Sequence, residues 1–263
     1  MLALVCFASQ NLRAQVAPSS AKPTAQSAQE RDDYRSATTA TGGAGMLQSA
    51  REFAKKYPKS TLRLYLYQRA LRQYQMENDA DGIRAAATEV LAIDPGDPLA
   101  LVLSATSAAD ELPPSGPDRD RKVSDIKHSV DLALHNLDRG ILPASAAPEQ
   151  AALYRSTLQH MAYSALGIMK LKTGDDAGAE KDLKTAAGLS TAHPDPSVWY
   201  HLALAQDHRK KYSAAINSVE QAMQLASSNP QLQRLAQLEH ERLYRLTGRA
   251  SASSEPGSSP PPQ

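Results

Sequence analysis

The sequence predicts an all-α fold, and three observations lead to this prediction. Apolar residues make up 41% of the 263 residues and are mainly alanine and leucine, which lose little side-chain freedom in a helix. Valine and isoleucine, which are typical of strands, are sparse. One pattern of residue types also occurs twice in succession, at a fixed offset, between Tyr163 and Ala222. We therefore expect helices and no appreciable sheet.

The repeated pattern consists of an aromatic residue, a leucine and an alanine at fixed positions. The aromatic residue is Tyr163 in the first copy and Trp199 in the second, an offset of 199 − 163 = 36 residues. The same offset separates the corresponding leucines and alanines, which are Leu166 and Leu202, and Ala179 and Ala215. An ordinary helical bundle lacks a fixed repeat period, so we favour a repeat architecture over that alternative.

Small residues stand where two antiparallel helices of one unit would cross. Gly167 with Ala179, and Ala203 with Ala215, have little or no side chain. Two helix backbones can approach closely at such positions, because the distance between helix axes depends on the side chains at the contact. The pattern resembles the tetratricopeptide repeat, a helix-turn-helix unit of about 34 residues. This resemblance implies a right-handed superhelical solenoid of stacked antiparallel helix pairs.

Two further features bear on the resemblance. Residues 91–95 form a Leu-x-Ile-Asp-Pro ending that is similar to the end of many units of this family. The chain departs from the family at Lys170 and Gln206, where the family has an aromatic residue. The small residues at the predicted crossings are unaffected by this departure.

The N-terminal residues predict export. Residues 1–8 are apolar but too few to span a bilayer. They resemble the end of a secretory signal that lacks its basic n-region, with cleavage after Ala14. Residues 1–15 are therefore predicted to be a signal-peptide remnant, and the protein to be periplasmic or secreted; a cytoplasmic protein with an apolar N-terminus is the alternative. Cys6 is the only cysteine, and Val5 before it disfavours a lipid anchor.

The remainder of the chain divides into three parts. Residues 16–45 contain almost no large apolar residue, so we predict a flexible leader. Residues 46–247 show helical periodicity and form the predicted repeat domain, whereas residues 248–263 are rich in serine and proline and are predicted to be a disordered tail. Prolines, glycines and polar turns separate the expected helices, which include 61–77, 81–93, 99–112, 118–137, 149–173 and 231–246.

Two of these helices have a distinctive composition. The segment 99–112 is apolar nearly all round, which predicts burial on more than one side. The segment 231–246 is polar on one side, and we predict that it caps the repeat domain with this side toward water. Its other side carries the leucines, which are Leu232, Leu235, Leu238 and Leu243.

No arrangement of residues in the sequence indicates catalysis, and we expect no enzyme. The chain lacks a Gly-x-Ser-x-Gly elbow, a phosphate-binding glycine loop and a Gly-x-Gly-x-x-Gly motif. Residues 240–244 begin like the zinc-protease motif His-Glu-x-x-His but end in tyrosine. Two histidine pairs are spaced seven residues apart, His201 with His208 and His128 with His135. That spacing is too wide for two metal ligands on one helix, so we expect solvent-facing histidines, no metal and no cofactor.

The resemblance implies a non-catalytic scaffold that binds a protein or peptide segment in the concave groove of the superhelix. Lysine and arginine are scattered and the net charge is +1, so no nucleic-acid partner is expected. No transmembrane segment is expected either, and the identity of the partner and the oligomeric state stay open. The family's groove positions fall here on Tyr65, Gln68, Arg72, Ser164, Ile168, Lys172, Tyr200, Leu204 and His208.

A second function remains open from the sequence. The run 53–60 resembles the helix endings of repeat-containing lipoproteins that help to assemble outer-membrane proteins. The alternative is therefore a structural component of the cell envelope.

Overall fold

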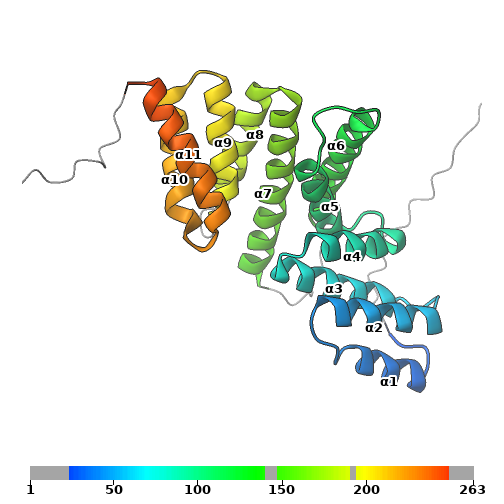
Figure 1. Ribbon diagram of the computed structural model, residues 1–263. Helices are drawn as coiled ribbons and strands as arrows, with labels where there is room; N and C mark the ends of the chain where they lie inside the picture. The colour runs from blue at the N-terminus through cyan, green and yellow to red at the C-terminus, as the bar shows by residue number, and fades with distance from the viewer. Residues whose placement is uncertain (1–23, 140–146, 190–193, 249–263) are drawn as a thin grey trace, which may run out of the picture.

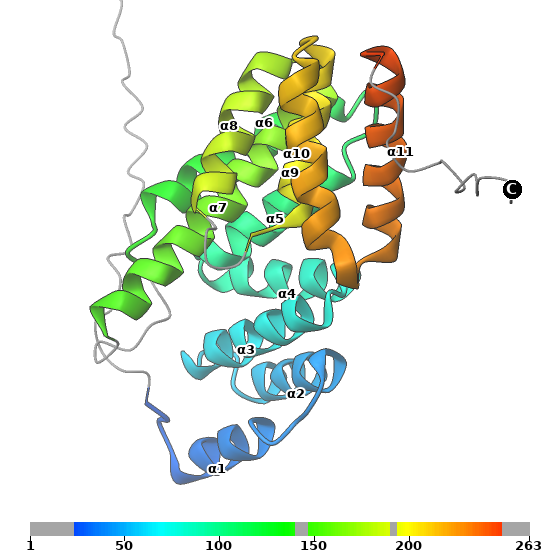
Figure 2. The ribbon, with the colours of Figure 1, turned by 90° about the vertical axis from the view of Figure 1, so that its left-hand side faces the viewer.

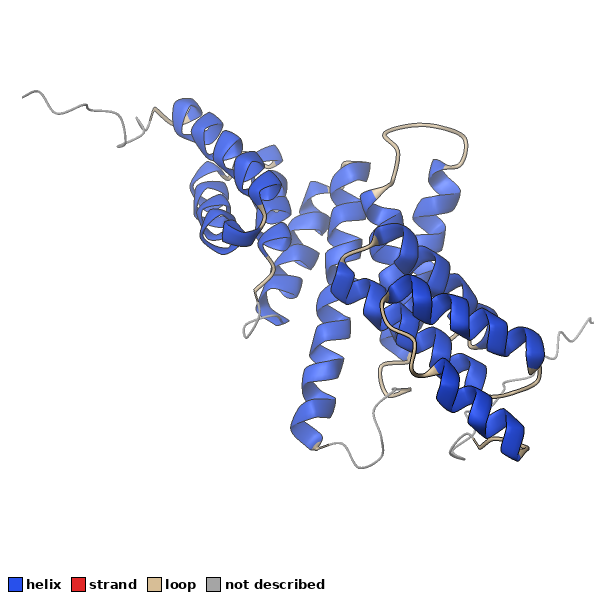
Figure 3. Ribbon diagram, turned by 60° about the horizontal axis from the view of Figure 1, so that its bottom comes forward, coloured by secondary structure: helices blue, strands red, loops and turns tan. Residues whose placement is uncertain are grey.

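The structure is a computed structural model that describes residues 24–139, 147–189 and 194–248. Within these ranges all regular structure is helical, with eleven α-helices and one short 3-10 helix (Figures 1 and 3). This confirms the all-α prediction. The helices are α1 Ala28–Ala37, α2 Gly43–Lys56, α3 Leu62–Glu77, α4 Ala80–Ile93, α5 Pro98–Asp110, α6 Arg119–His135, α7 Pro148–Thr173, α8 Asp176–Leu189, α9 Pro196–His208, α10 Tyr212–Leu225, η1 Ala226–Ser228 and α11 Pro230–Leu246.

Helices that follow one another in the chain pack side by side, so the molecule is built from adjacent helix pairs (Figures 1 and 2). The first copy of the repeated pattern becomes α7 and α8, and the second becomes α9 and α10. α5 contacts α4, α6 and α7, which confirms the burial on several sides that its apolar composition predicted. α7 has 26 residues and contacts α5, α6, α8 and α9. This long helix therefore connects the N-terminal and C-terminal halves of the described chain.

Short polar side chains and prolines start several helices. Asp97 precedes α5, and its carboxylate accepts a hydrogen bond from the backbone N–H of Ala100 at 2.8 Å. Asp79 caps α4 in the same way through the N–H of Gly82 at 3.0 Å. Proline occupies the first turn of α5, α7, α9 and α11, where an N–H group would have no intrahelical partner. The local sequence thus determines where these helices begin.

The prediction of a flexible leader over residues 16–45 was wrong for much of the described part, because α1 lies within it and α2 begins at Gly43. A capping box starts α1. The Ser27 hydroxyl accepts from the N–H of Glu30 at 3.0 Å, and the Glu30 carboxylate accepts from the N–H of Gln26 at 2.6 Å. The Ser-x-x-Glu spacing is visible in the sequence, but an argument from composition alone overlooks it.

Contacts with α2 hold α1 in place. The Asp33 carboxylate accepts hydrogen bonds from Lys56 Nζ and Tyr57 Oη, each at 2.5 Å. The rings of Tyr34 and Phe53 meet edge to face, with centroids 6.0 Å apart. One aromatic contact and one shared carboxylate therefore compensate for the scarcity of large apolar residues in α1.

The capping helix α11 differs in part from its prediction. Its buried residues are Ala236, Glu239 and Leu243, whereas Leu235 and Leu238 are 42% and 55% exposed. The predicted leucine face is therefore wrong for these two residues. The reason is that α11 packs mainly on α10, and this single neighbour covers a narrower stripe than the leucines span.

Some predicted segments lie outside the described residues. These are the signal-peptide remnant 1–15, with Cys6, and the tail 248–263 apart from Gly248. Among the described helices, none is both long enough and apolar enough to cross a membrane.

The small residues of the repeated pattern lie in the core. Ala179, Ala203 and Ala215 are completely buried. A Cβ atom added at Gly167 would lie only 2.5 Å from Cγ of Leu183, so α7 and α8 approach each other at a point where only glycine fits without a shift. The close approach predicted at Gly167 is therefore present in the first copy, but the side chain nearest the glycine is Leu183 and not the predicted Ala179.

The two departures from the family pattern form polar pairs at equivalent positions, the first partly buried and the second buried. Lys170 of α7 donates to the Asp182 carboxylate of α8 at 2.6 Å. In the second copy the Ser218 hydroxyl of α10 donates to the Gln206 side chain of α9 at 2.8 Å. Both members of the second pair follow those of the first by 36 residues, since 206 − 170 = 36 and 218 − 182 = 36. Each pair thus links the two helices of its unit where the family uses an aromatic contact.

The glycine crossing leads to a stability prediction. Gly167→Ala should lower the free energy of unfolding by roughly 1 to 3 kcal/mol, because the new methyl group overpacks the contact with Leu183. Gly188→Ala in α8 is the matched control, since no atom lies within 4 Å of its added Cβ. The control should leave stability unchanged or raise it by up to about 1 kcal/mol through helix propensity. Urea unfolding followed by circular dichroism measures both, and equal effects of the two substitutions would contradict a tight crossing.

Candidate functional site

The nine residues predicted to line a groove fall into two groups in the structure. Six keep accessible surface, and three are buried. The accessible ones are Tyr65 and Arg72 of α3, Lys172 of α7, and Tyr200, Leu204 and His208 of α9. The buried ones are Gln68, Ser164 and Ile168, with exposures of 5%, 7% and 3%.

The buried residues correct the predicted groove. Ser164 and Ile168 lie on α7, which has α5, α6, α8 and α9 around it, so no open face remains at these positions. Gln68 is covered because its amide nitrogen donates to the Asp97 carboxylate, at 2.7 Å, at the start of α5. These three residues contribute to packing between helix pairs and offer no surface to a partner.

A polar cluster joins α3, α5 and α7. Asp97, which is 2% exposed, accepts from Gln68 and from the N–H of Ala100. Burial raises the pKa of the Asp97 carboxyl, although these hydrogen bonds partly oppose the rise. Burial lowers the pKa of the nearby Arg72 guanidinium, an effect that Tyr154 and Asp97 partly offset. Arg72 makes no hydrogen bond or ion pair of 4 Å or less with any described residue.

Tyr154 of α7 completes this cluster, although no sequence pattern singled it out. Its hydroxyl group is buried and has no hydrogen-bond partner among the described residues. Burial, followed by the negative charge of Asp97, raises the pKa of Tyr154 to about 12, while Arg72 lowers it. The phenol is therefore neutral at physiological pH. Arg72 and Tyr154 together present unused hydrogen-bond donors beside one buried carboxylate.

A second polar group lies between the C-terminal ends of α5 and α7 and the adjacent helix α9. Lys172 Nζ donates to the backbone carbonyl of Asp110, and Arg119 donates to the carbonyl of Lys172 at 2.8 Å. Desolvation raises the pKa of the Asp110 carboxyl, and His201 and Lys172 partly lower it. Lys172 is thus accessible but fixed in position by contacts that the sequence did not reveal.

The accessible residues of α9 face two neighbouring helices. Tyr200 packs against the small core that includes Ala236 and Leu243 of α11, and burial, followed by Glu239, raises the pKa of its phenol. His208 Nδ1 lies 2.9 Å from the Asp176 carboxylate of α8. Tyr200 is therefore half-buried under the capping helix, and His208 contacts the neighbouring pair.

Two histidines contradict the expectation of solvent-facing imidazoles. His201 is partly buried, its Nδ1 lies 2.8 Å from the carbonyl oxygen of Ser197, and burial lowers its pKa. His160 is only 8% exposed. His128 and His135, by contrast, are exposed as predicted. The position of a histidine along its own helix does not reveal whether a neighbouring helix will cover it. The sequence therefore could not distinguish the buried histidines from the exposed ones.

His160 connects three helices. Its Nδ1 lies 2.9 Å from the carbonyl oxygen of Ala186 in α8, and its Nε2 lies 3.6 Å from the Asp195 carboxylate at the start of α9. Burial opposes the charged imidazole, but the contacts with Asp195 and Ala186 outweigh it, so the pKa of His160 is raised. The pKa of Asp195 is lowered, because His160 and the N–H of Ser197 outweigh burial there. Contacts of His160 with α8 and with the start of α9 therefore link the two copies of the repeat, and they favour the protonated imidazole.

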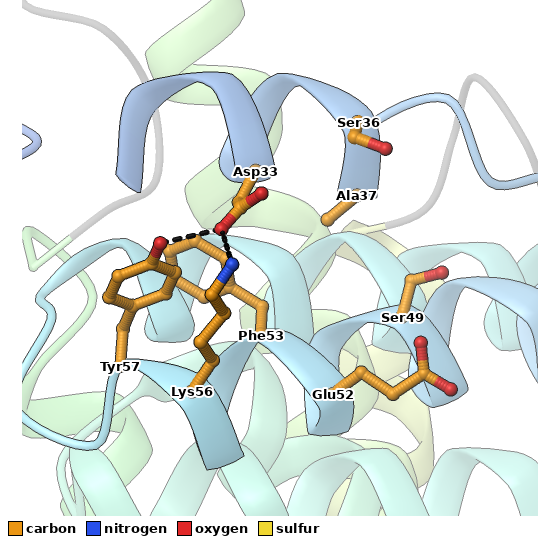
Figure 4. A pocket seen from close by; sticks show the side chains of 8 residues that line it. All are labelled: Asp33, Ser36, Ala37, Ser49, Glu52, Phe53, Lys56 and Tyr57. Atoms are coloured by element: carbon orange, nitrogen blue, oxygen red, sulfur yellow. Dashed lines mark hydrogen bonds and ion pairs between the residues drawn. The ribbon is translucent and has the colours of Figure 1, made fainter. Parts of the chain in front are cut away.

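A shallow pocket lies between α1 and α2 (Figure 4). Its volume is about 210 Å³, and Asp33, Lys56 and Tyr57 on one side are already bonded to one another. This pairing uses the polar groups that a ligand would need, so the pocket is a weaker candidate than the cluster around Arg72.

In the described part of the chain, no group of three or more histidine, cysteine, aspartate or glutamate residues could hold a metal ion. Comparisons with protein-family models and with curated proteins found no match.

The His160 contacts predict a stability that depends on pH. A histidine whose pKa is raised on folding stabilises the fold fully below its unfolded pKa of 6.5, and this contribution disappears as the pH rises through the folded value. His160→Gln should therefore destabilise by roughly 1 to 3 kcal/mol at about pH 6, the range for a hydrogen bond to a charged group, and by less at about pH 8.5.

Thermal unfolding at both pH values measures the difference. His128→Gln serves as the control, since this histidine is exposed and forms no ion pair within 4 Å with a described residue. A loss for His160→Gln that is the same at both pH values would contradict a charged His160.

Proposed function

We propose that this chain is a non-catalytic scaffold that binds a segment of a partner protein on the surface carrying Tyr65 and Arg72. The helix pairs would stack as in tetratricopeptide repeats, with the first helix of each pair facing the partner. The adjacent pairing of the helices and the repeat offset of 36 residues support this arrangement. The observation that carries the proposal is Arg72 itself, which is half-buried, forms no ion pair within 4 Å with any described residue, and shares its helix with the exposed Tyr65.

Tyr65 and Arg72 are suited to protein recognition for different reasons. Tyr65 is 40% exposed and lies seven residues, or two helical turns, before Arg72 on α3. An exposed tyrosine gives a large contact area and loses little side-chain freedom on binding. Tyrosine and arginine are also the residue types enriched among those that contribute most to binding energy.

The charge around Arg72 favours an acidic partner segment. A guanidinium group that is partly removed from water and lacks an ion pair gains more from an incoming carboxylate than a fully hydrated one would. The buried Asp97 nearby is already occupied by Gln68 and by a backbone N–H group, so it leaves the arginine donors available.

Partner capture followed by affinity measurement tests this proposal. The wild-type protein is used to capture proteins from the native host, and the captured partner is then titrated by calorimetry. Tyr65→Ala and Arg72→Gln should each weaken binding by at least about tenfold, or about 1.4 kcal/mol, with unchanged circular dichroism.

Arg234→Gln is the matched control, because Arg234 is an exposed arginine on the distant helix α11 and forms no ion pair with a described residue. It should leave the affinity unchanged. Unaltered binding by both α3 variants, or equal weakening by the control, would exclude this surface.

A further inference from the structure

Three positively charged side chains converge on one buried carboxylate where α8 meets the turn between α9 and α10. The carboxylate is that of Glu180, whose side chain is 4% exposed. Lys184 Nζ lies 2.6 Å from Oε1, Lys211 Nζ lies 3.0 Å from Oε1 and 2.9 Å from Oε2, and Arg209 donates to Oε2. We call Lys184, Arg209 and Lys211 the cationic triad, and the Glu180 side chain its central carboxylate.

The geometry brings the three cations unusually close together. Because Lys184 and Lys211 both bind Oε1, their ammonium nitrogens can be no farther apart than the sum of these two contact distances. Arg209 and Lys211 likewise share Oε2. Like charges at such separations repel, and the central carboxylate holds them in place. These contacts lower the pKa of Glu180 to about 2 against the opposing effect of burial, so the carboxylate is charged at any physiological pH.

The cations keep both charge and hydrogen-bond donors to spare. One carboxylate balances only one of three positive charges, which leaves a local excess of two. This balance counts the four groups alone; the neighbouring acids contact other partners, Asp182 on Lys170, Asp176 on His208, and Asp207 together with Glu239 on Arg242. The side chains of Lys184, Arg209 and Lys211 are 55%, 35% and 44% exposed, so part of each remains accessible to water. An ammonium group has three donors and a guanidinium five, and the carboxylate uses only some of them.

We propose that the cationic triad is a binding site for a phosphate group, either free phosphate or a phosphate monoester. A phosphate monoester carries a charge of about −1.5 to −2 at neutral pH and three acceptor oxygens, which match the excess of two charges and the remaining donors. A carboxylate carries only one charge and would leave the excess half balanced. The site lies apart from the Tyr65 and Arg72 surface, and the proposal does not depend on the partner-binding function.

Calorimetric titration with inorganic phosphate near neutral pH and at low ionic strength tests the site directly. Phosphate should bind the wild-type protein at millimolar or lower concentration, and acetate should bind at least about tenfold more weakly. Lys184→Met should weaken phosphate binding by at least about tenfold, because it removes one cation but keeps the aliphatic part of the side chain. Lys127→Met is the control, since it removes the same charge from an exposed lysine on α6.

Lys184→Met leaves Arg209 and Lys211 on Glu180, so the contact of α8 with the following turn is retained. Circular dichroism verifies the fold of each variant, and Arg209→Met provides a second removal of one cation. A titration with O-phosphoserine distinguishes the source of the phosphate, since a monoester site binds it at least as tightly as inorganic phosphate. No binding of either phosphate by the wild type, equal binding of acetate, or equal weakening by Lys127→Met would overturn the proposal.

Discussion

The close approach of α7 and α8 at Gly167 is the constraint on which much of the described structure depends. Leu183 fills the space that any Cβ would occupy, and the residues of α8 that are completely buried include Ala179, Leu183 and Ala186. α7 then has its other sides available for α5, α6 and α9, and it contacts all three. A larger residue at this position would separate the central pair and, through α7, disturb the packing of both halves. Gly167 therefore affects more of the fold than its own contact with Leu183, since a protein interior transmits small displacements to neighbouring helices.

The polar pairs show how the two copies keep one arrangement without the aromatic contacts of the family they resemble. Lys170 with Asp182 and Gln206 with Ser218 occupy equivalent positions, 36 residues apart, and each joins the two helices of one unit. A hydrogen bond has stricter geometry than an apolar contact, and a buried polar group that loses its partner costs about 1 to 3 kcal/mol. These pairs therefore disfavour a helix that slides or rotates against its neighbour, even where they add little net stability.

The sequence predicted the fold better than it predicted the site, and the reason is physical. Periodicity, prolines and capping residues act within one helix. The starts of α4 at Asp79 and of α5 at Asp97, and the end of α7 at Gly174, could therefore be placed from the sequence. Exposure depends on helices far away in the chain. Gln68 is buried because Asp97 lies opposite it, and Ile168 is buried because α7 is surrounded, neither of which follows from position on one helix.

Functional residues could be found from the sequence where their exposure depends on their own helix, and they were missed where it depends on distant helices. Tyr65 and Arg72 were predicted from their places on one helix, and they remain accessible because α3 packs chiefly on its sequence neighbours α2 and α4. Tyr154 and Glu180 were missed, because each owes its character to groups from other helices. Glu180 looks like an ordinary helical glutamate until the fold brings Arg209 and Lys211 to it, 29 and 31 residues later in the chain.

The surface with Tyr65 and Arg72 and the cationic triad around Glu180 differ in charge, so we expect them to bind different kinds of ligand. At Arg72 a half-buried guanidinium lies on the same helix as the exposed Tyr65, so we expect contact with the aromatic ring to supply much of the binding energy and the charge to select among partners. At Glu180 three cations lie together with little apolar surface, so binding there must be mainly electrostatic and weaken as salt is added. Added salt should therefore affect a ligand at Glu180 more strongly than a partner at Tyr65 and Arg72. A partner segment that carries a phosphate could use one surface or the other, and its salt dependence would reveal which.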